Sequence, residues 1–228
     1  MRARGVAVAV AAACALALLA TAAAPAHAQE EPAPPPPSPQ RVLVTGDSLM
    51  YVMQDPLARR LRHRGYEVTT DSRVGTGLTK PWLMDWAKLA REHVEKLRPD
   101  VTFMFIGGND VHSIRGERCC GPRWVERYAE RARELMAIYG RTVWLTLPAP
   151  VDPALGRVFR AINRALRLAA AGDRAQLVDI VPVFTPHWRY RRAMLWNGER
   201  VIVRQMDGVH LGHQGVKIAA DLATAALT

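Results

Sequence analysis

Cysteine is scarce in this sequence, and its placement excludes a disulfide-stabilised scaffold. One of the three cysteines, Cys14, lies in an apolar N-terminal run, and the other two, Cys119 and Cys120, are adjacent. Neighbouring cysteines bridge only through a strained peptide, and a zinc site needs spaced thiolates. We therefore expect no disulfide framework. Cys119 and Cys120 are interpreted as free, bridged to each other or linking two chains.

The usual cofactor motifs are also missing. Gly75-Thr76-Gly77 lacks the third glycine of a dinucleotide-binding fingerprint, and no phosphate-binding Gly-Lys-Ser/Thr loop occurs. Asp207, His210 and His213 stand three residues apart, a spacing that metal ligands can have. The glycines between them favour an extended turn over the helix that would align the three side chains. We therefore expect no metal site and no nucleotide cofactor.

Serine is the third scarce residue, which narrows the search for a nucleophile. Only Ser38, Ser48, Ser72 and Ser113 occur, and Ser38 lies in a proline tract. Ser48 follows an apolar, β-branched run that leads into Gly-Asp-Ser, the order expected where a buried strand ends in a sharp turn. The second glycine of a nucleophile elbow is absent, which argues against the α/β-hydrolase fold. Ser48 is therefore the candidate, at the carboxyl edge of a sheet.

The N-terminal segment predicts export. Residues 1–28 combine two arginines, a long alanine-rich apolar run and an Ala-His-Ala exit, which is the pattern of a cleaved signal peptide. The alternative is an uncleaved membrane anchor. Residues 29–40 form a proline-rich linker, and residues 41–228 form one domain. We expect a periplasmic or extracellular protein with no stable membrane span after cleavage.

The domain is strongly basic. Loss of Arg2 and Arg4 with the signal peptide would lower the formal net charge only from +10 to +8. An exported protein rarely meets nucleic acid, so we expect an anionic envelope polymer, and no nucleic acid, as the partner of this charge. The alternative is a solvated basic surface that keeps the protein soluble.

Strand and helix patterns alternate five times along the domain. Strands are expected at residues 41–46, 66–70, 101–106, 142–147 and 177–180. Helices are expected at residues 49–64 (with a break at Pro56), 81–97, 125–139, 155–171 and 214–227. Such alternation predicts an α/β fold in which helices cover both faces of a parallel sheet. Residues 182–206 interrupt the pattern and indicate an inserted loop or hairpin.

Four sites in the chain supply the groups that acyl transfer by serine requires. His210 can take the proton of Ser48, and Asp207, three residues earlier, can orient the imidazole. The amide of Ser48, the side chain of Asn109 and a loop glycine can bind the oxyanion. For that glycine the sequence favours Gly77, which leads directly into the next helix, with Gly75 in reserve.

These residues resemble the conserved blocks of the SGNH (GDSL) hydrolases. The matching segments are Gly46-Asp47-Ser48-Leu49, a loop glycine, Gly107-Gly108-Asn109-Asp110 and Asp207-Gly208-Val209-His210. The resemblance implies a three-layer α/β/α fold with about five parallel strands in flavodoxin-like order. It also implies a cofactor-free mechanism in which Ser48, Asp207 and His210 are catalytic and Ser48, Asn109 and a glycine form the oxyanion hole.

The expected function is hydrolysis of small acyl esters, with acetyl groups on envelope carbohydrate as the candidate substrate. One alternative is an O-acyltransferase that delivers the acyl group to a polysaccharide, because a sugar hydroxyl can replace water in the second step. The other is a catalytically idle module that binds anionic glycan through its arginines and through the aromatic residues of the insertion at 182–206.

Overall fold

The computed structural model describes residues 40–171 and 175–227. The expected signal peptide, Cys14 and all but the last residue of the expected linker lie outside the described residues. Within the described ranges, none of the helices combines the length and apolar character needed to cross a bilayer.

The sheet has the expected five parallel strands. Its spatial order is β2-β1-β3-β4-β5, and the strands are β1 (Arg41–Gly46), β2 (Glu67–Ser72), β3 (Val101–Phe105), β4 (Thr142–Leu145) and β5 (Ala175–Val178). Every residue of β3 and β4 is buried, as central strands covered on both faces require. The flavodoxin-like order and the α/β fold class are confirmed.

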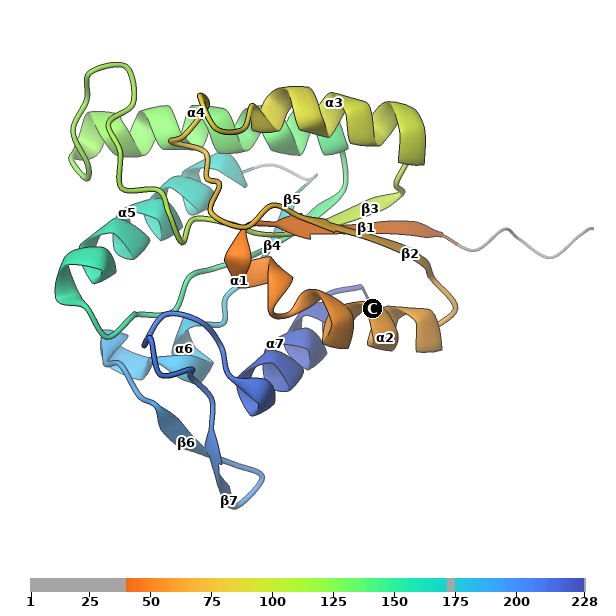
Figure 1. Ribbon diagram of the computed structural model, residues 1–228, viewed down its shortest axis with the longest axis vertical. Helices are drawn as coiled ribbons and strands as arrows, with labels where there is room; N and C mark the ends of the chain where they lie inside the picture. The colour runs from red at the N-terminus through yellow and green to blue at the C-terminus, as the bar shows by residue number, and fades with distance from the viewer. Residues whose placement is uncertain (1–39, 172–174, 228) are drawn as a thin grey trace, which may run out of the picture. The chain divides into compact units, whose positions relative to one another are not determined.

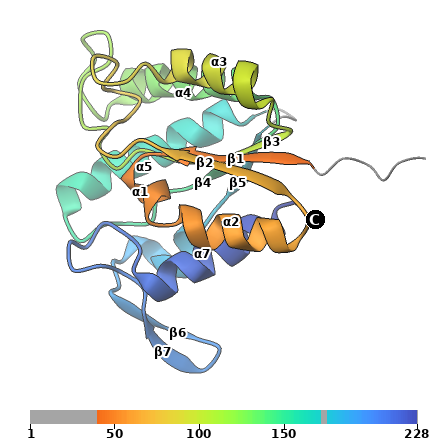
Figure 2. The same cartoon turned by 45° about the vertical axis from the view of Figure 1, so that its right-hand side comes forward.

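Helices cover both faces of this sheet (Figures 1 and 2). The two on one face are α2 (Gln54–His63) and α7 (His213–Ala225), and the three on the other are α3 (Trp86–Leu97), α4 (Pro122–Tyr139) and α5 (Pro153–Ala169). The inward faces of α4 and α5 bring large side chains such as Trp124 and Phe159 into the core. The three layers place every β-to-α connection at the carboxyl edge of the sheet.

Two helix boundaries show the clearest differences from the sequence-based expectation. The first helical segment breaks at Val52 and Met53, between α1 (Ser48–Tyr51) and α2, and not at Pro56. Pro56 lies in the first turn of α2, where its missing N–H has no intrahelical partner to lose. Helix α3 begins at Trp86 and not at Pro81, because the Asp85 carboxylate caps it by accepting a 2.9 Å bond from the Lys88 amide.

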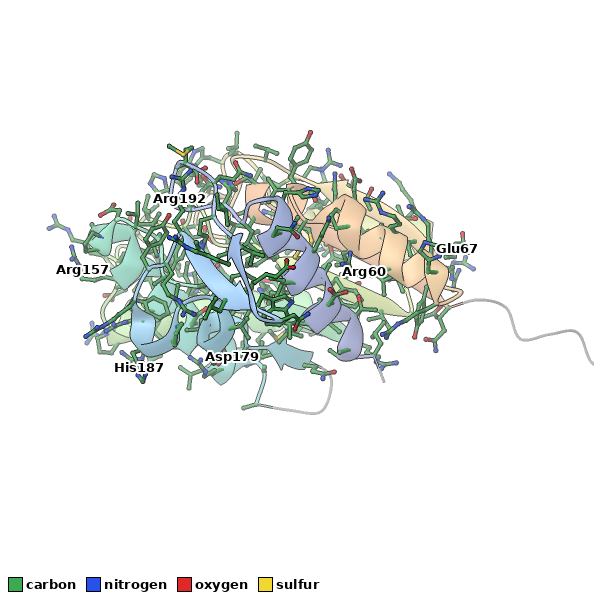
Figure 3. All side chains as sticks on the ribbon, turned by 90° about the horizontal axis from the view of Figure 1, so that it is seen from below. Arg60, Glu67, Arg157, Asp179, His187 and Arg192 are labelled. Atoms are coloured by element: carbon green, nitrogen blue, oxygen red, sulfur yellow. A yellow bond between two sulfur atoms is a disulfide. The ribbon has the colours of Figure 1, made fainter. Side chains whose placement is uncertain are left out.

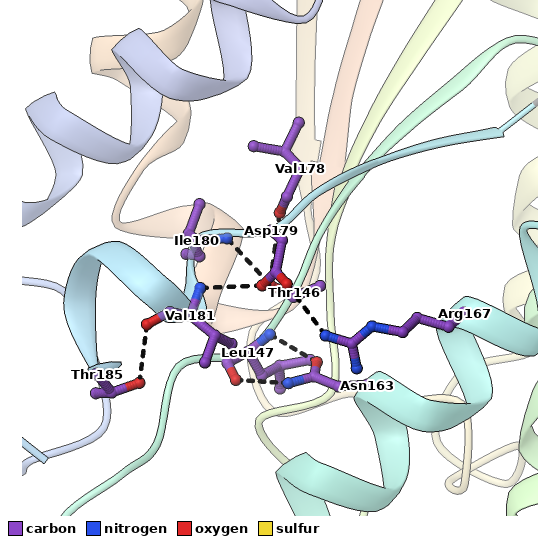
Figure 4. A network of polar contacts seen from close by, with 9 residues as sticks. All are labelled: Thr146, Leu147, Asn163, Arg167, Val178, Asp179, Ile180, Val181 and Thr185. Carbon is purple, nitrogen blue, oxygen red and sulfur yellow. Dashed lines mark hydrogen bonds and ion pairs between the residues drawn. The ribbon is translucent and has the colours of Figure 1, made fainter. Parts of the chain in front are cut away.

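A polar network fixes the connection between β4 and α5 (Figure 4). The buried Asn163 side chain forms two 2.8 Å hydrogen bonds with the main chain of Leu147, donating to its carbonyl and accepting from its amide. Thr146 donates to Asp179 at 2.8 Å, and Asp179 also pairs with Arg167. These contacts hold the loop that leads from β4 to residues 149–152.

The expected insertion between residues 182 and 206 contains a hairpin. This part of the chain comprises α6 (Val181–Phe184), a short 3-10 helix η1 (Pro186–Trp188) and the antiparallel strands β6 (Ala193–Trp196) and β7 (Glu199–Ile202). The two strands form the hairpin. In Figure 1 the hairpin projects beyond the helices that flank the sheet, and the chain then returns toward α1 before entering α7. That return loop, residues 203–212, carries Asp207 and His210.

Candidate active site

The turn after β1 exposes Ser48 because the preceding glycine allows two strands to approach closely. A Cβ at Gly46 would lie 2.9 Å from the carbonyl carbon of Phe105 on β3, a distance that real side chains do not tolerate. The chain then turns at Asp47 and enters α1 with Ser48 as the first helical residue. At that position the Ser48 amide has no intrahelical partner, which leaves it free to act as a donor.

Asp47 is buried and ties the ends of β1 and β3 together. One carboxylate oxygen accepts from the amide of Leu49 at 2.8 Å, and the other accepts from Gly107 at 2.9 Å and Gly108 at 2.8 Å. Burial raises the pKa of Asp47 to about 7, although these amide bonds act to lower it. The bonds bring Ser48 and the loop that carries Asn109 to the same edge of the sheet.

Three of the predicted catalytic side chains form a continuous hydrogen-bonded chain. Nε2 of His210 lies 2.8 Å from Oγ of Ser48, and Nδ1 of His210 lies 2.6 Å from Oδ2 of Asp207. The other oxygen of Asp207 accepts from the amides of Val209 and His210 at 2.8 and 3.0 Å. The carboxylate therefore orients the imidazole, and both nitrogens of the imidazole are engaged.

The carboxylate of Asp207 is held in its ionised form. Partial burial acts to raise its pKa, but the hydrogen bonds from the His210 ring and from the amides of Val209 and His210 outweigh that effect and lower it. Lowering favours the charged carboxylate, which is the form that can stabilise a positive charge on the neighbouring imidazole.

Arg204 supports the loop that carries these residues, a role that no sequence pattern around it predicts. Its guanidinium is buried and donates to the carbonyl of Val209 at 2.6 Å and to that of Ala149 at 2.9 Å. It also lies over the ring of Tyr190, with 5.8 Å to the centroid. Burial lowers the pKa of Arg204 to about 10, while nearby Tyr190 and Asp207 act to raise it. Arg204 therefore links the loop of His210 to the loop after β4.

The predicted oxyanion residues lie on two neighbouring loops. Nδ2 of Asn109 donates to the carbonyl of Thr76 at 3.0 Å, which connects the loop after β3 to the loop after β2. The side-chain amide nitrogen of asparagine carries two hydrogens, so one remains available for a ligand. Gly75 is half-buried with a φ of +79°, whereas Gly77 is buried.

Gly77 packs against a second buried carboxylate, that of Asp110. A Cβ at Gly77 would lie 2.9 Å from Cγ of Asp110. Asp110 accepts from the amide of Thr79 at 2.7 Å and from the hydroxyl of Tyr128 at 2.7 Å. Burial raises the pKa of Asp110, although these hydrogen bonds act to lower it. The close approach of loop and carboxylate explains why this position is a glycine.

No group of three or more histidine, cysteine, aspartate or glutamate side chains is arranged to hold a metal ion in residues 40–171 and 175–227. Of the three residues with ligand-like spacing, Asp207 and His210 are hydrogen-bonded to each other, whereas His213 is the first residue of α7. Of the three states expected for the adjacent cysteines, the structure contains the disulfide between Cys119 and Cys120.

Comparison with known proteins places this fold and site in context. Residues 41–226 match the family described as "Protein of unknown function (DUF459)". No protein with a curated functional description matches the chain.

Several solved structures share the fold at low sequence identity. TesA is 20% identical, with a TM-score of 0.56 over 83% of this chain and 98% of its own. A GDSL-like lipase from Bacteroides thetaiotaomicron is 18% identical, with a TM-score of 0.57 over 82% of this chain and 87% of its own. An acetyl xylan esterase, AlAXEase, is 20% identical, with a TM-score of 0.52 over 82% of this chain and 100% of its own.

Proposed function

Because the chain belongs to the DUF459 family and has the fold of the SGNH hydrolases, we propose that it is a serine esterase acting through an acyl-enzyme on Ser48. The observation that carries this proposal is the hydrogen-bonded chain from Ser48 through His210 to Asp207. A nucleophile, a base and an orienting carboxylate in this order are the groups that activate a serine hydroxyl.

The first half of the reaction forms an ester on Ser48. Oγ of Ser48 attacks the carbonyl carbon of the substrate as its proton passes to Nε2 of His210. The amide of Ser48, Nδ2 of Asn109 and an amide of the loop that contains Gly75 and Gly77 donate to the oxyanion. The bond to the leaving alcohol then breaks, and the alcohol departs with the proton held on His210.

The second half restores the enzyme. A water molecule attacks the acyl-enzyme while giving a proton to His210, and the bond between the acyl carbon and Oγ of Ser48 breaks. His210 returns the proton to Oγ, and the carboxylic acid is released. Asp207 remains ionised throughout and stabilises the imidazolium, in line with its lowered pKa.

We propose short acyl esters, acetyl esters first, as the substrates, carried on carbohydrate of the cell envelope. An acetyl xylan esterase among the structures with this fold supports the acetyl group. The predicted signal peptide supports an envelope location. The preferred acyl length is measured by offering the 4-nitrophenyl esters of acetate, butyrate and octanoate in parallel, and kcat/KM is expected to be highest for the acetate.

The test of esterase activity is a comparison of two serine variants. Wild-type protein is expected to hydrolyse 4-nitrophenyl acetate, and Ser48→Ala is expected to lower kcat/KM by roughly 10⁴-fold. Ser113→Ala is the matched control, since Ser113 is exposed and lies outside the hydrogen-bonded chain. Equal rates for wild type and Ser48→Ala would overturn the proposal and favour an idle binding module.

A further inference from the structure

An open pocket of about 340 Å³ lies beside the loop that carries Asp207 and His210. Three segments line it: the loop after β4, the first turns of α5, and the end of η1 with the chain that follows it. Its volume falls within the range of small-ligand sites, which is about 300–1,000 Å³. None of its lining residues belongs to the hydrogen-bonded chain described above, so the pocket is a separate region of the surface.

A hydrogen bond and a close approach, both at Gly208, join this pocket to the proposed catalytic loop. The amide of Val151, which lines the pocket, donates to the carbonyl of Gly208 at 3.0 Å. A Cβ at Gly208 would lie 3.6 Å from the hydroxyl oxygen of Tyr190, another lining residue. Gly208 directly follows Asp207, so a ligand in the pocket would lie next to the proposed catalytic loop.

The pocket contains positive charge that the protein does not neutralise. Arg157 and Arg160 line it from α5, are exposed, and have no hydrogen bond or ion pair within the described part of the chain. Arg167, three turns further along the helix from Arg157, instead pairs with Asp179. The nearby Asp152 carboxylate caps α5 by accepting hydrogen bonds from the amides of Ala154 and Leu155. Unpaired guanidinium groups at a concave surface are suited to bind carboxylate or phosphate.

Two aromatic side chains, Trp188 and Tyr190, line the same pocket. The guanidinium of Arg160 lies over the ring of Trp188, 5.0 Å from its centroid, and the ring of Tyr190 stands beside it in the pocket. His187 and Trp188 both have left-handed φ values, 54° and 61°, an uncommon conformation for residues other than glycine. Arg160 and Arg204 each cover one face of these two rings, which leaves the other face of each ring to pack against the apolar C–H face of a sugar. The guanidinium donors of Arg157 and Arg160 remain available for an acidic substituent.

The cationic surface continues along α5 past this pocket. A second hollow, of about 410 Å³, shares Arg157 and Arg160 and extends to Arg164 and to the Cys119–Cys120 disulfide. Arg157 and Arg164 are about 10 Å apart along the helix at its usual rise per residue. In Figure 3, Arg157 projects outward at the opposite side of the molecule from Arg60 on α2. Such a row of charges suits a ligand with repeated negative groups.

We propose that this pocket binds the carbohydrate portion of the substrate, and that this carbohydrate is an acidic oligosaccharide. The arginines of α5 bind its carboxylates, and Trp188 and Tyr190 pack against its sugar rings. The assignment rests on the proposed esterase function, because it places the pocket on the leaving-alcohol side of Ser48.

Binding is tested with the Ser48→Ala protein, which removes turnover. The probes are tetragalacturonate, its fully methyl-esterified form and the oligonucleotide dT5, which carries the same number of charges as tetragalacturonate. The double variant Arg157→Gln/Arg160→Gln is expected to weaken tetragalacturonate binding, measured by calorimetry, by about tenfold or more. The control is Arg59→Gln/Arg200→Gln, which removes two exposed charges on α2 and β7 and is expected to change Kd less than twofold.

The outcomes separate this proposal from the proposed function. Equal binding by the two double variants, equal affinity for the methyl ester, or tighter binding of dT5 would each overturn the pocket assignment. Turnover provides a second readout, since Arg157→Gln/Arg160→Gln is expected to lower kcat/KM for acetylated tetragalacturonate about tenfold, whereas the control Arg59→Gln/Arg200→Gln is expected to change it less than twofold. If the wild-type protein hydrolysed no ester but the binding results were as expected, the esterase proposal would be rejected and the binding site retained.

Discussion

Nε2 of His210 lies 2.8 Å from Oγ of Ser48 although 162 positions separate the two residues in the chain. The contact forms because β1 delivers Ser48 to the carboxyl edge of the sheet and the loop before α7 returns to the same edge. Asp207 then fixes the imidazole from the far side at 2.6 Å.

Asp207→Asn is expected to reduce catalysis while preserving the fold. Asparagine keeps the size of the side chain but removes the negative charge that faces Nδ1 of His210. We expect kcat for 4-nitrophenyl acetate to fall by roughly 10²- to 10⁴-fold with little change in KM. Circular dichroism should match wild type, since the Asp207 side chain is 43% exposed. A rate within twofold of wild type would show that Asp207 does not orient the imidazole.

Asn109→Ala removes a proposed oxyanion donor and a loop contact. We expect kcat to fall by roughly 10²- to 10³-fold, the usual effect of losing one oxyanion donor. The control is Asn197→Gly in the exposed β6–β7 turn, where φ is +51° and glycine fits without strain. If the two variants had equal activity, Asn109 would be a structural residue that only holds the Thr76 carbonyl.

Gly77→Ala should destabilise the protein more than Gly75→Ala. A methyl group at residue 77 would meet the Asp110 carboxylate, whereas a methyl group at residue 75 meets nothing within 4 Å. The cost of the change at Gly75 is therefore only that of placing alanine at a φ of +79°, about 1–2 kcal/mol. Thermal unfolding of both variants checks the order, and an equal or reversed order would contradict the packing described for Gly77.

Arg204→Met should weaken both folding and catalysis. The change leaves the carbonyls of Val209 and Ala149 without their donor, and each unsatisfied buried group costs about 1–3 kcal/mol. Because Val209 adjoins His210, we expect kcat to fall while KM for 4-nitrophenyl acetate stays within twofold. Arg204→Lys should recover part of the stability, since one ammonium can bond one carbonyl. Unchanged kcat in a folded Arg204→Met protein would remove its positioning role.

Asp47 should make folding stability depend on pH between about 4 and 7. Its pKa is about 7 in the folded protein, mainly through burial, against an ordinary value of 3.8. The folded state therefore holds this proton more tightly, so the stabilisation is fully present below pH 4 and is lost as pH rises through 7.

Urea unfolding from pH 4 to pH 8 measures this effect. The stability of wild type should decline more steeply over that range than that of Asp47→Asn, which has no titrating group at this position. Asp110 is present in both proteins, and because its charge acts to raise the pKa of Asp47, the difference between the two curves reports Asp47 together with its interaction with Asp110. Parallel curves would contradict a raised pKa at Asp47.

Much of the fold could be predicted because it depends on local patterns. The apolar runs of β1 and β3 identified central strands, and the Gly-Asp-Ser turn identified Ser48 at their carboxyl edge. The short separation between Asp207 and His210 likewise placed the base and its carboxylate on one loop. Patterns within a few residues were sufficient for these features.

The remaining features depend on contacts between distant segments. Arg204 donates to Ala149, 55 positions away, and nothing near Arg204 in the chain reveals that partner. The burial of Gly77 follows from Asp110, which reaches it from the loop after β3. The start of α3 at Trp86 depended on whether Asp85 caps the helix, a choice that apolar spacing alone does not decide.

The most direct test of the account is covalent labelling of the nucleophile. A serine-directed fluorophosphonate should add one phosphonyl group to wild-type protein, and peptide mass spectrometry should locate it on Ser48. His210→Ala should slow labelling by at least about 100-fold, because the serine loses its base. Labelling at another residue, or equally fast labelling of Ser48 without His210, would contradict the claim that His210 activates Ser48.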